Sequence, residues 1–152
     1  MDIGSGKEYP ANALSNFSPH QFTIDGVKCN SMEGFLKSLK FENPDMQREV
    51  CTLVGFAAKK KGRNKNWKES QTLHWQGAQI SRKSDAYASL LERAFMEMAK
   101  QSASFQNALK AAQNAVFKHS IGKSKESETV LTEREFCKLL NVCREWVNST
   151  FP

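Results

Sequence analysis

The sequence predicts a mainly α fold, a compact multihelical domain with one small β-hairpin near the N-terminus. Apolar residues recur at helical spacing through most of the chain after residue 30, and helix-starting signals precede these segments. Only residues 22–30 alternate in the manner of paired strands. With 152 residues the chain can bury a core of its own, so we expect residues 1–152 to form a single domain. Residues 1–10, with two glycines, read as a loose arm.

The first expected elements are the hairpin and a helix over residues 31–41. An Asp-Gly pair in the middle of residues 22–30 supplies the two-residue turn that a tight hairpin requires. Ser31 is a typical N-cap residue, which places Glu33 in the first turn of the helix. The helix dipole at that position favours an ionised carboxylate.

Four further helices are expected, each with a recognisable start. The first begins at Asn43-Pro44 and ends at Gly62, because proline suits the first helical position and glycine the end. The next two begin at Ser84-Asp85 and at Ser104, and the last begins at the capping box Thr132–Glu135. The apolar stripes on these helices are interpreted as buried core: Met46, Val50, Leu53, Val54 and Ala57; Leu90, Leu91, Ala94, Phe95 and Met98; Phe105, Ala108, Leu109, Ala112 and Val116; Phe136, Leu139, Leu140, Cys143 and Val147. Residues 59–83 and 118–131 are expected to be polar loops.

The composition indicates an ordinary globular protein, with 39% hydrophobic and 25% charged residues. No apolar run is long enough for a membrane span and no secretory leader is visible, so we expect a cytoplasmic protein without membrane contact. The four cysteines and three histidines lack the spacing of metal ligands, and no metal or other cofactor is expected. The net charge of +6 fits a phosphate-bearing ligand without requiring one.

The positive charge is concentrated after the second expected helix. Six cationic residues fall within ten positions, together with a glycine and an aromatic residue: Lys59, Lys60, Lys61, Arg63, Lys65, Lys68, Gly62 and Trp67. Such a segment suits phosphate contacts and base stacking, and it predicts DNA or RNA contact. A mobile, solvated loop explains the same composition, and both interpretations stay open.

Glu33 and Lys40 form the most informative pair of residues. They are seven positions apart, about two helical turns, so both project from one face of the expected helix. A carboxylate and an amine held at a pocket wall are suitable groups for breaking a glycosidic bond. Glutamate and lysine on a helix also commonly form a solvated face, so this pair alone does not establish a site.

The residues around this pair follow an ordered pattern. Leu14-Ser-Asn-Phe17, Phe22–Val27, Ser31-Met-Glu33 and Lys40-Phe41 occur at tight spacing, and Ala57-Ala58, Gly62-Arg63, Trp67 and Phe105-Gln-Asn107 continue it. The ordered set resembles the NADAR (YbiA-like) family over residues 12–146. The resemblance implies a YbiA-like domain that hydrolyses N-glycosidic bonds on ribose. The substrate classes that it implies are ADP-ribose on guanine bases of nucleic acid and phosphorylated ribosyl-amine intermediates of the riboflavin pathway.

The resemblance also implies site residues. Glu33 matches the acidic position, where a carboxylate stabilises an oxocarbenium-like centre or activates water. Lys40 matches the Lys-Phe step, and its amine is a candidate proton donor, phosphate ligand or Schiff-base nucleophile. Asn16, with Phe17 beside it, matches the Ser-Asn-Phe step and is a candidate for ribose hydroxyls, although Asn also forms turns.

Further substrate-binding candidates lie in the two polar loops. Trp67 and Trp75 offer flat faces for a base, and Arg63 offers a fork for phosphate, with Arg82 following the second Trp. An Asp before Trp-Gly, frequent in the family, is missing here, where the loop reads Lys118-His-Ser-Ile-Gly122. Three explanations stay open: His119 or Ser120 substitutes, Glu126 or Glu128 reaches in, or the substrate differs.

Three functions are therefore under consideration. The first is an N-glycosidase or ADP-ribosyl hydrolase acting on a small-molecule or nucleic-acid-linked ribosyl substrate. The second is a non-catalytic binder of ADP-ribose or a related nucleotide, and the third is a basic helical domain that binds nucleic acid. The sequence leaves the oligomeric state open.

Overall fold

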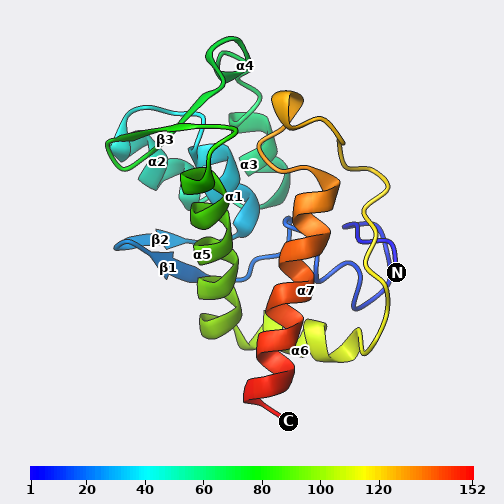
Figure 1. The fold of residues 1–152 in the computed structure, drawn as a ribbon. Helices are drawn as coiled ribbons and strands as arrows, with labels where there is room; N and C mark the ends of the chain where they lie inside the picture. The colour runs from blue at the N-terminus through cyan, green and yellow to red at the C-terminus, as the bar shows by residue number, and fades with distance from the viewer.

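The computed structural model describes residues 1–152 and contains seven α-helices, one 3₁₀ helix and two small antiparallel sheets (Figure 1). The expectation of a mainly α fold is wrong. Helices account for 48% of the residues and strands for 11%, and the fold is mixed α/β. The difference comes from a second hairpin that lies inside a segment expected to be loop.

The first hairpin forms as predicted. Strands β1 (Phe22–Ile24) and β2 (Val27–Cys29) pair antiparallel. The turn between them is Asp25-Gly26, and both residues have positive φ, 50° and 77°. A two-residue turn of this kind matches the twist of the strands that it joins, which explains why the Asp-Gly signal was informative.

The second hairpin consists of β3 (Thr72–Trp75) and β4 (Ala78–Ser81). Its turn is Gln76-Gly77, also with positive φ at both positions, 44° and 94°. Glutamine is not a usual residue for such a conformation, so the turn signal was weak. Buried Gln47 stabilises it, because its side-chain oxygen accepts the Gln76 backbone N–H at 2.9 Å and its amide donates to the His74 carbonyl at 2.7 Å.

Helix α1 (Met32–Ser38) is shorter than expected and ends before Lys40. Ser31 is its N-cap, as predicted, and the Ser31 Oγ accepts the Gly34 N–H at 3.0 Å. The same hydroxyl donates to the Leu53 carbonyl at 2.9 Å, which joins the start of α1 to the end of α2.

The next expected helix is two helices, α2 (Pro44–Cys51) and α3 (Gly55–Lys61). The chain breaks at residues 52–54, and Gly55 has a φ of 56°. A left-handed residue cannot continue an α-helix, so one apolar stripe in the sequence became two helices with different axes. Short helix α4 (Trp67–Ser70) follows and was not predicted.

Three longer helices complete the fold. Helices α5 (Asp85–Gln101) and α7 (Glu133–Thr150) lie side by side, and α6 (Ala103–Ala111) packs against both (Figure 1). The predicted caps of α5 and α7 are confirmed, including the complete capping box at Thr132. Helix α6 is capped by Ser102 rather than beginning at Ser104, and its stripe stops short of Val116, which is 71% exposed. The 3₁₀ helix η1 (Glu126–Glu128) precedes α7.

The first three residues are anchored to the rest of the fold, whereas residues 5–9 of the expected loose arm are exposed. The Ile3 side chain is 1% exposed and belongs to the continuous apolar core of 33 residues. Its N–H donates to the Lys118 carbonyl at 2.8 Å, and the Lys118 N–H donates to the Met1 carbonyl at 2.9 Å. The N-terminal segment therefore runs beside the chain that follows α6 (Figure 1). None of the helices combines the length and the hydropathy needed to cross a lipid bilayer.

Gly34 is needed for the close packing of α1 on α2. A Cβ at this position would lie 2.7 Å from the Leu53 carbonyl oxygen and 3.0 Å from that of Val50. We expect Gly34→Ala to destabilise the fold by about 1–3 kcal/mol through overpacking, which exceeds the gain of about 1 kcal/mol in helix propensity. Thermal unfolding followed by circular dichroism measures the effect. Gly6→Ala is the matched control, because its Cβ would meet nothing within 4 Å; an equal melting temperature for both variants would contradict the packing argument.

Candidate functional site

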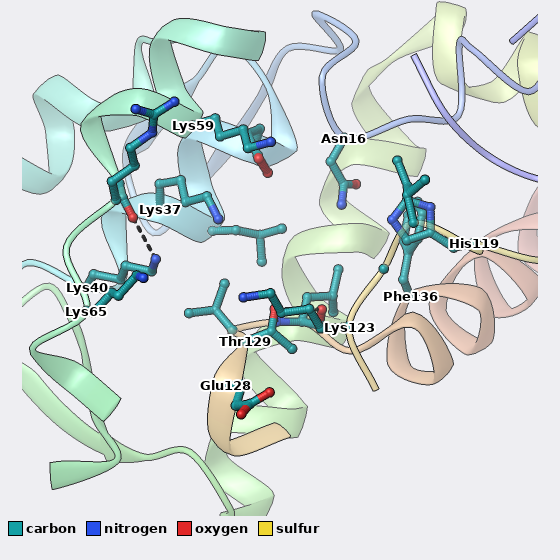
Figure 2. Close-up of a pocket in the computed structure, with 18 of the residues that line it drawn as sticks. Asn16, Lys37, Lys40, Lys59, Lys65, His119, Lys123, Glu128, Thr129 and Phe136 are labelled. Carbon is teal, nitrogen blue, oxygen red and sulfur yellow. Dashed lines mark hydrogen bonds between the residues drawn. The ribbon is translucent and has the colours of Figure 1, made fainter. Parts of the chain in front are cut away.

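A pocket of about 480 Å³ lies where four distant parts of the chain meet (Figure 2). The N-terminal loop contributes Asn16, and α1 with the turn after it contributes Glu33, Lys37 and Lys40. Helix α3 and the segment after it form a second wall over residues 59–68. The chain from residue 119 to residue 136 closes the remaining side.

Glu33 is a buried carboxylate at the start of α1, 9% exposed. Its side chain has neither a hydrogen bond nor an ion pair within 4 Å, although it lines the pocket. Burial raises the pKa of Glu33, and the positive charges of Lys37, Lys59 and Lys40 act in the opposite direction. The helix dipole also favours its anion. The carboxylate is thus held without a protein partner at the pocket wall, where it is free to meet a ligand.

Lys40 lies in the turn that follows α1. Its Nζ donates a hydrogen bond to the Gly62 carbonyl at 2.6 Å, the contact drawn as a dashed line in Figure 2. Burial and the positive charge of neighbouring Lys37 lower the pKa of Lys40 to about 8, while Glu33 opposes the shift. At neutral pH the amine is mostly protonated, but its proton is easier to release than that of an ordinary lysine.

Positive charge dominates the pocket lining. Seven cationic side chains line it, against two carboxylates: Lys37, Lys40, Lys59, Arg63, Lys65, Lys68 and Lys123, against Glu33 and Glu128. Figure 2 shows Lys37 and Lys40 on one side of the pocket, with Lys123 extending toward them from the other side. Like charges this close repel one another, so the arrangement favours a ligand with several negative charges, such as phosphate groups.

Five of the residues proposed from the sequence meet in this pocket: Asn16, Glu33, Lys40, Arg63 and His119. Asn16 and Glu33 are hydrogen-bonded through their backbones, because the Asn16 carbonyl accepts the Glu33 N–H at 3.1 Å. The other five proposed residues, Phe17, Trp67, Trp75, Arg82 and Ser120, are outside the pocket lining.

The two tryptophans proposed as base-stacking residues are buried in the core instead. Trp75 is 6% exposed, its ring meets Phe35 edge-on at 5.0 Å, and its Nε1 donates to Asp25 at 2.8 Å. It lies in β3, where alternate side chains face the core, rather than in a loop. Trp67 is 4% exposed at the start of α4. An indole with both faces covered has no surface to offer a base.

Arg82 supports the pocket from behind. It is 2% exposed, and its guanidinium forms a bidentate pair with Glu135 at 2.7 and 3.2 Å. Its Nε donates to the Thr129 carbonyl at 2.9 Å, and residues 129–131 line the pocket. The Arg82 side chain is therefore buried and uses three of its N–H donors to fix this wall, and it is not among the residues that line the pocket.

The loop from residue 118 to residue 131 contains the four residues offered as replacements for the Asp that the NADAR resemblance leads us to expect, and two of them line the pocket. His119 lines the pocket, and its Nδ1 donates to the Ile3 carbonyl at 2.9 Å. Ser120 turns away, and its backbone N–H and hydroxyl bond to Asp2. Glu128 lines the pocket from η1, whereas Glu126 pairs with Lys83 at 3.7 Å.

Several lining residues were not proposed from the sequence, among them Lys37, Lys123, Thr129 and Phe136. Lys37 follows Glu33 by four positions on one helix, a spacing that places both on one face and would have indicated it. The other three are about ninety or more positions from Glu33, and no local pattern in the sequence brings them to it.

The comparisons with known proteins give one family and one shared fold. A family described as Bacteriophage protein GP30.3 matches residues 8–145. The 17.1 kDa protein of the Gp30-rIII intergenic region of Enterobacteria phage T4 is 38% identical over 147 residues, which cover 95% of this chain and 97% of that protein. The NMR structure of the E. coli protein YbiA superimposes with a TM-score of 0.64 at 15% identity, over 99% of this chain and 85% of YbiA. The fold is therefore YbiA-like.

The shifted pKa of Lys40 can be measured by chemical labelling. We expect acylation of Lys40 to reach half of its maximal rate near pH 8, since only the neutral amine reacts. Glu33→Gln removes a nearby negative charge that raises this pKa, so the midpoint moves to lower pH. Peptide mass spectrometry after timed labelling gives the rates. Glu42→Gln, an exposed substitution outside the pocket, is the control; an unchanged midpoint in Glu33→Gln would show that the two groups are not coupled.

Proposed function

The chain belongs to the bacteriophage GP30.3 family, and we propose that it is an N-glycosidase that cleaves a ribosyl C–N bond, with the chemistry of the NADAR family. The candidate substrates are an ADP-ribosylated guanine base and a phosphoribosyl-amine. The observation that carries the proposal is the buried, unpartnered Glu33 carboxylate in a pocket whose other charged groups are almost all cations.

The proposed reaction is a hydrolysis. As the C–N bond breaks, positive charge develops on the ribose, and the anionic Glu33 stabilises it and orients the attacking water. Water supplies the hydroxyl group to the anomeric carbon and gives its other proton to the Glu33 carboxylate, and the leaving nitrogen takes a proton from a separate donor. In this proposal Asn16, whose backbone contacts that of Glu33, binds ribose hydroxyls, and the cations that line the pocket hold the phosphate groups.

Lys40 is the proposed proton donor to the leaving nitrogen. With a pKa of about 8 it is mostly charged at neutral pH and still acidic enough to give up a proton in the transition state. The Gly62 carbonyl accepts one of its hydrogens and fixes the direction of the amine, which leaves the others for the ligand. A Schiff-base role would require the neutral amine, which is the minor form below pH 8.

Replacement of the acid tests the assignment most directly. We expect Glu33→Gln to lower kcat by about 100-fold or more, because the amide keeps the shape but loses the negative charge. Release of product from ADP-ribosylated guanine DNA and from a phosphoribosyl-amine, followed by chromatography and mass spectrometry, measures turnover. Glu42→Gln is the matched control outside the pocket and should keep full activity. Tight binding of both substrates by the unmodified protein without any product release would instead indicate a non-catalytic binder.

The pH dependence of the reaction distinguishes the roles of Lys40. If the protonated amine is the donor, kcat/KM falls as pH rises through about 8, because the charged form is lost above its pKa. Lys40→Ala should lose activity at all pH values, and Lys40→Arg should retain phosphate binding but not proton donation. A profile that rises through pH 8 would contradict the donor role and favour the neutral nucleophile. Full activity of Lys40→Arg would favour a phosphate ligand.

A further inference from the structure

An exposed aromatic side chain, Phe56, lies beside Lys59, which lines the pocket. Phe56, in the first turn of α3, is 68% exposed. The Phe17 ring meets it edge-on, with ring centroids 6.3 Å apart and planes at 75°. The Nζ of Lys59 lies 5.8 Å from the centre of the Phe56 ring. Lys59 lines the pocket, and Phe17 directly follows Asn16, which also lines it, so the aromatic pair adjoins the pocket mouth.

The interior of the pocket offers little aromatic surface. His119 and Phe136 are its aromatic lining residues, and their rings pack edge-on against each other at 4.9 Å. The Phe136 side chain is 1% exposed. A planar group attached to a ligand in the pocket therefore finds its available flat apolar face outside the lining, on Phe56.

The surroundings of Phe56 are strongly cationic. Lys59, Lys60 and Lys61 occupy the last turn of α3 and are all exposed, and Arg63 and Lys65 follow them, also exposed. None of these five side chains has a carboxylate partner within 4 Å. A stacking ring beside a row of free cations is the combination that holds single-stranded nucleic acid, since bases stack on the ring while phosphates follow the charges.

We propose that Phe56, supported by Phe17, is the stacking surface for an unpaired nucleobase of a single-stranded polynucleotide. The strand continues over the cationic end of α3, and, resting on the proposed function, the ribosyl group to be cleaved enters the pocket beside Asn16. Phe56 is then a specificity-determining residue, which favours nucleic-acid-linked substrates over free phosphoribosyl-amines.

Binding of an unmodified oligonucleotide tests the surface without any dependence on turnover. The probe is a fluorescein-labelled single-stranded DNA of about ten nucleotides containing guanine, within the usual site size of such surfaces, and fluorescence anisotropy reports its Kd. We expect Phe56→Ala to weaken binding about tenfold, the effect of losing one stacked base, and Phe56→Trp to restore it.

Phe151→Ala is the matched control. Phe151 is also an exposed phenylalanine, 42% accessible, with Lys110 Nζ 5.1 Å from its ring centre, and it lies near the C-terminus away from the pocket. Its loss should leave the Kd unchanged. Equal Kd values for Phe56→Ala and the unmodified protein, or an equal loss in Phe151→Ala, would overturn the proposal.

The salt dependence separates stacking from charge. The double variant Lys60→Ala/Lys61→Ala should reduce the slope of log Kd against log salt by about 1.4, since each phosphate contact on a single strand contributes about 0.7, whereas Phe56→Ala should leave the slope unchanged. Duplex DNA of the same sequence offers no unpaired base, so Phe56→Ala should not weaken its binding; an equal loss on duplex DNA would argue against stacking.

The outcome is independent of the proposed hydrolysis. Phe56-dependent binding in a protein that releases no product would support this surface and contradict the N-glycosidase proposal. Hydrolysis of a phosphoribosyl-amine by a protein that shows no Phe56-dependent binding would support the enzyme and overturn the surface.

Discussion

The site depends on one carboxylate that is buried without a partner. Burial of an ionised group is costly unless nearby charges or dipoles compensate. For Glu33 the dipole is that of the N-terminus of α1, and the charges are those of the surrounding lysines. The features that hold α1 in place therefore hold the acid in place. Ser31 caps the helix and binds the Leu53 carbonyl, and Gly34 lets the helix approach the end of α2 closely.

The same lysines that stabilise Glu33 destabilise one another. Lys40 shows this most clearly, because burial and Lys37 lower its pKa while Glu33 raises it. Gly62 helps to position both lysines. Its carbonyl accepts a hydrogen bond from the Lys40 amine, and its lack of a Cβ leaves room for the aliphatic part of the Lys37 side chain. An anionic ligand would relieve this repulsion, so binding of such a ligand should also stabilise the folded protein.

The opposite wall of the pocket is held by groups that never reach it. The Arg82–Glu135 pair ties β4 to α7 and fixes the Thr129 carbonyl, and the N-terminal residues pair with the chain at Lys118, next to His119. This chain, which belongs to the GP30.3 family and has a YbiA-like fold, therefore forms its pocket from segments that are far apart in the sequence, from Asn16 to Phe136. Arg82, proposed from the sequence as a site residue, contributes by positioning this wall, whereas Trp75 packs against Phe35 of α1.

The sequence by itself determined the local features: the Asp25-Gly26 hairpin, the caps at Ser31 and Thr132, the core stripe of α7 and the presence of Glu33 and Lys40 at one pocket. Each depends on residues within a few positions of one another, where backbone preference and helical spacing are strong. Only the tertiary structure decided the Gln76-Gly77 hairpin, the burial of both proposed tryptophans, and the arrival of Lys123 and Glu128 in the pocket that Glu33 lines. These depend on contacts between segments far apart in the chain, and local propensity carries no information about which segments will meet.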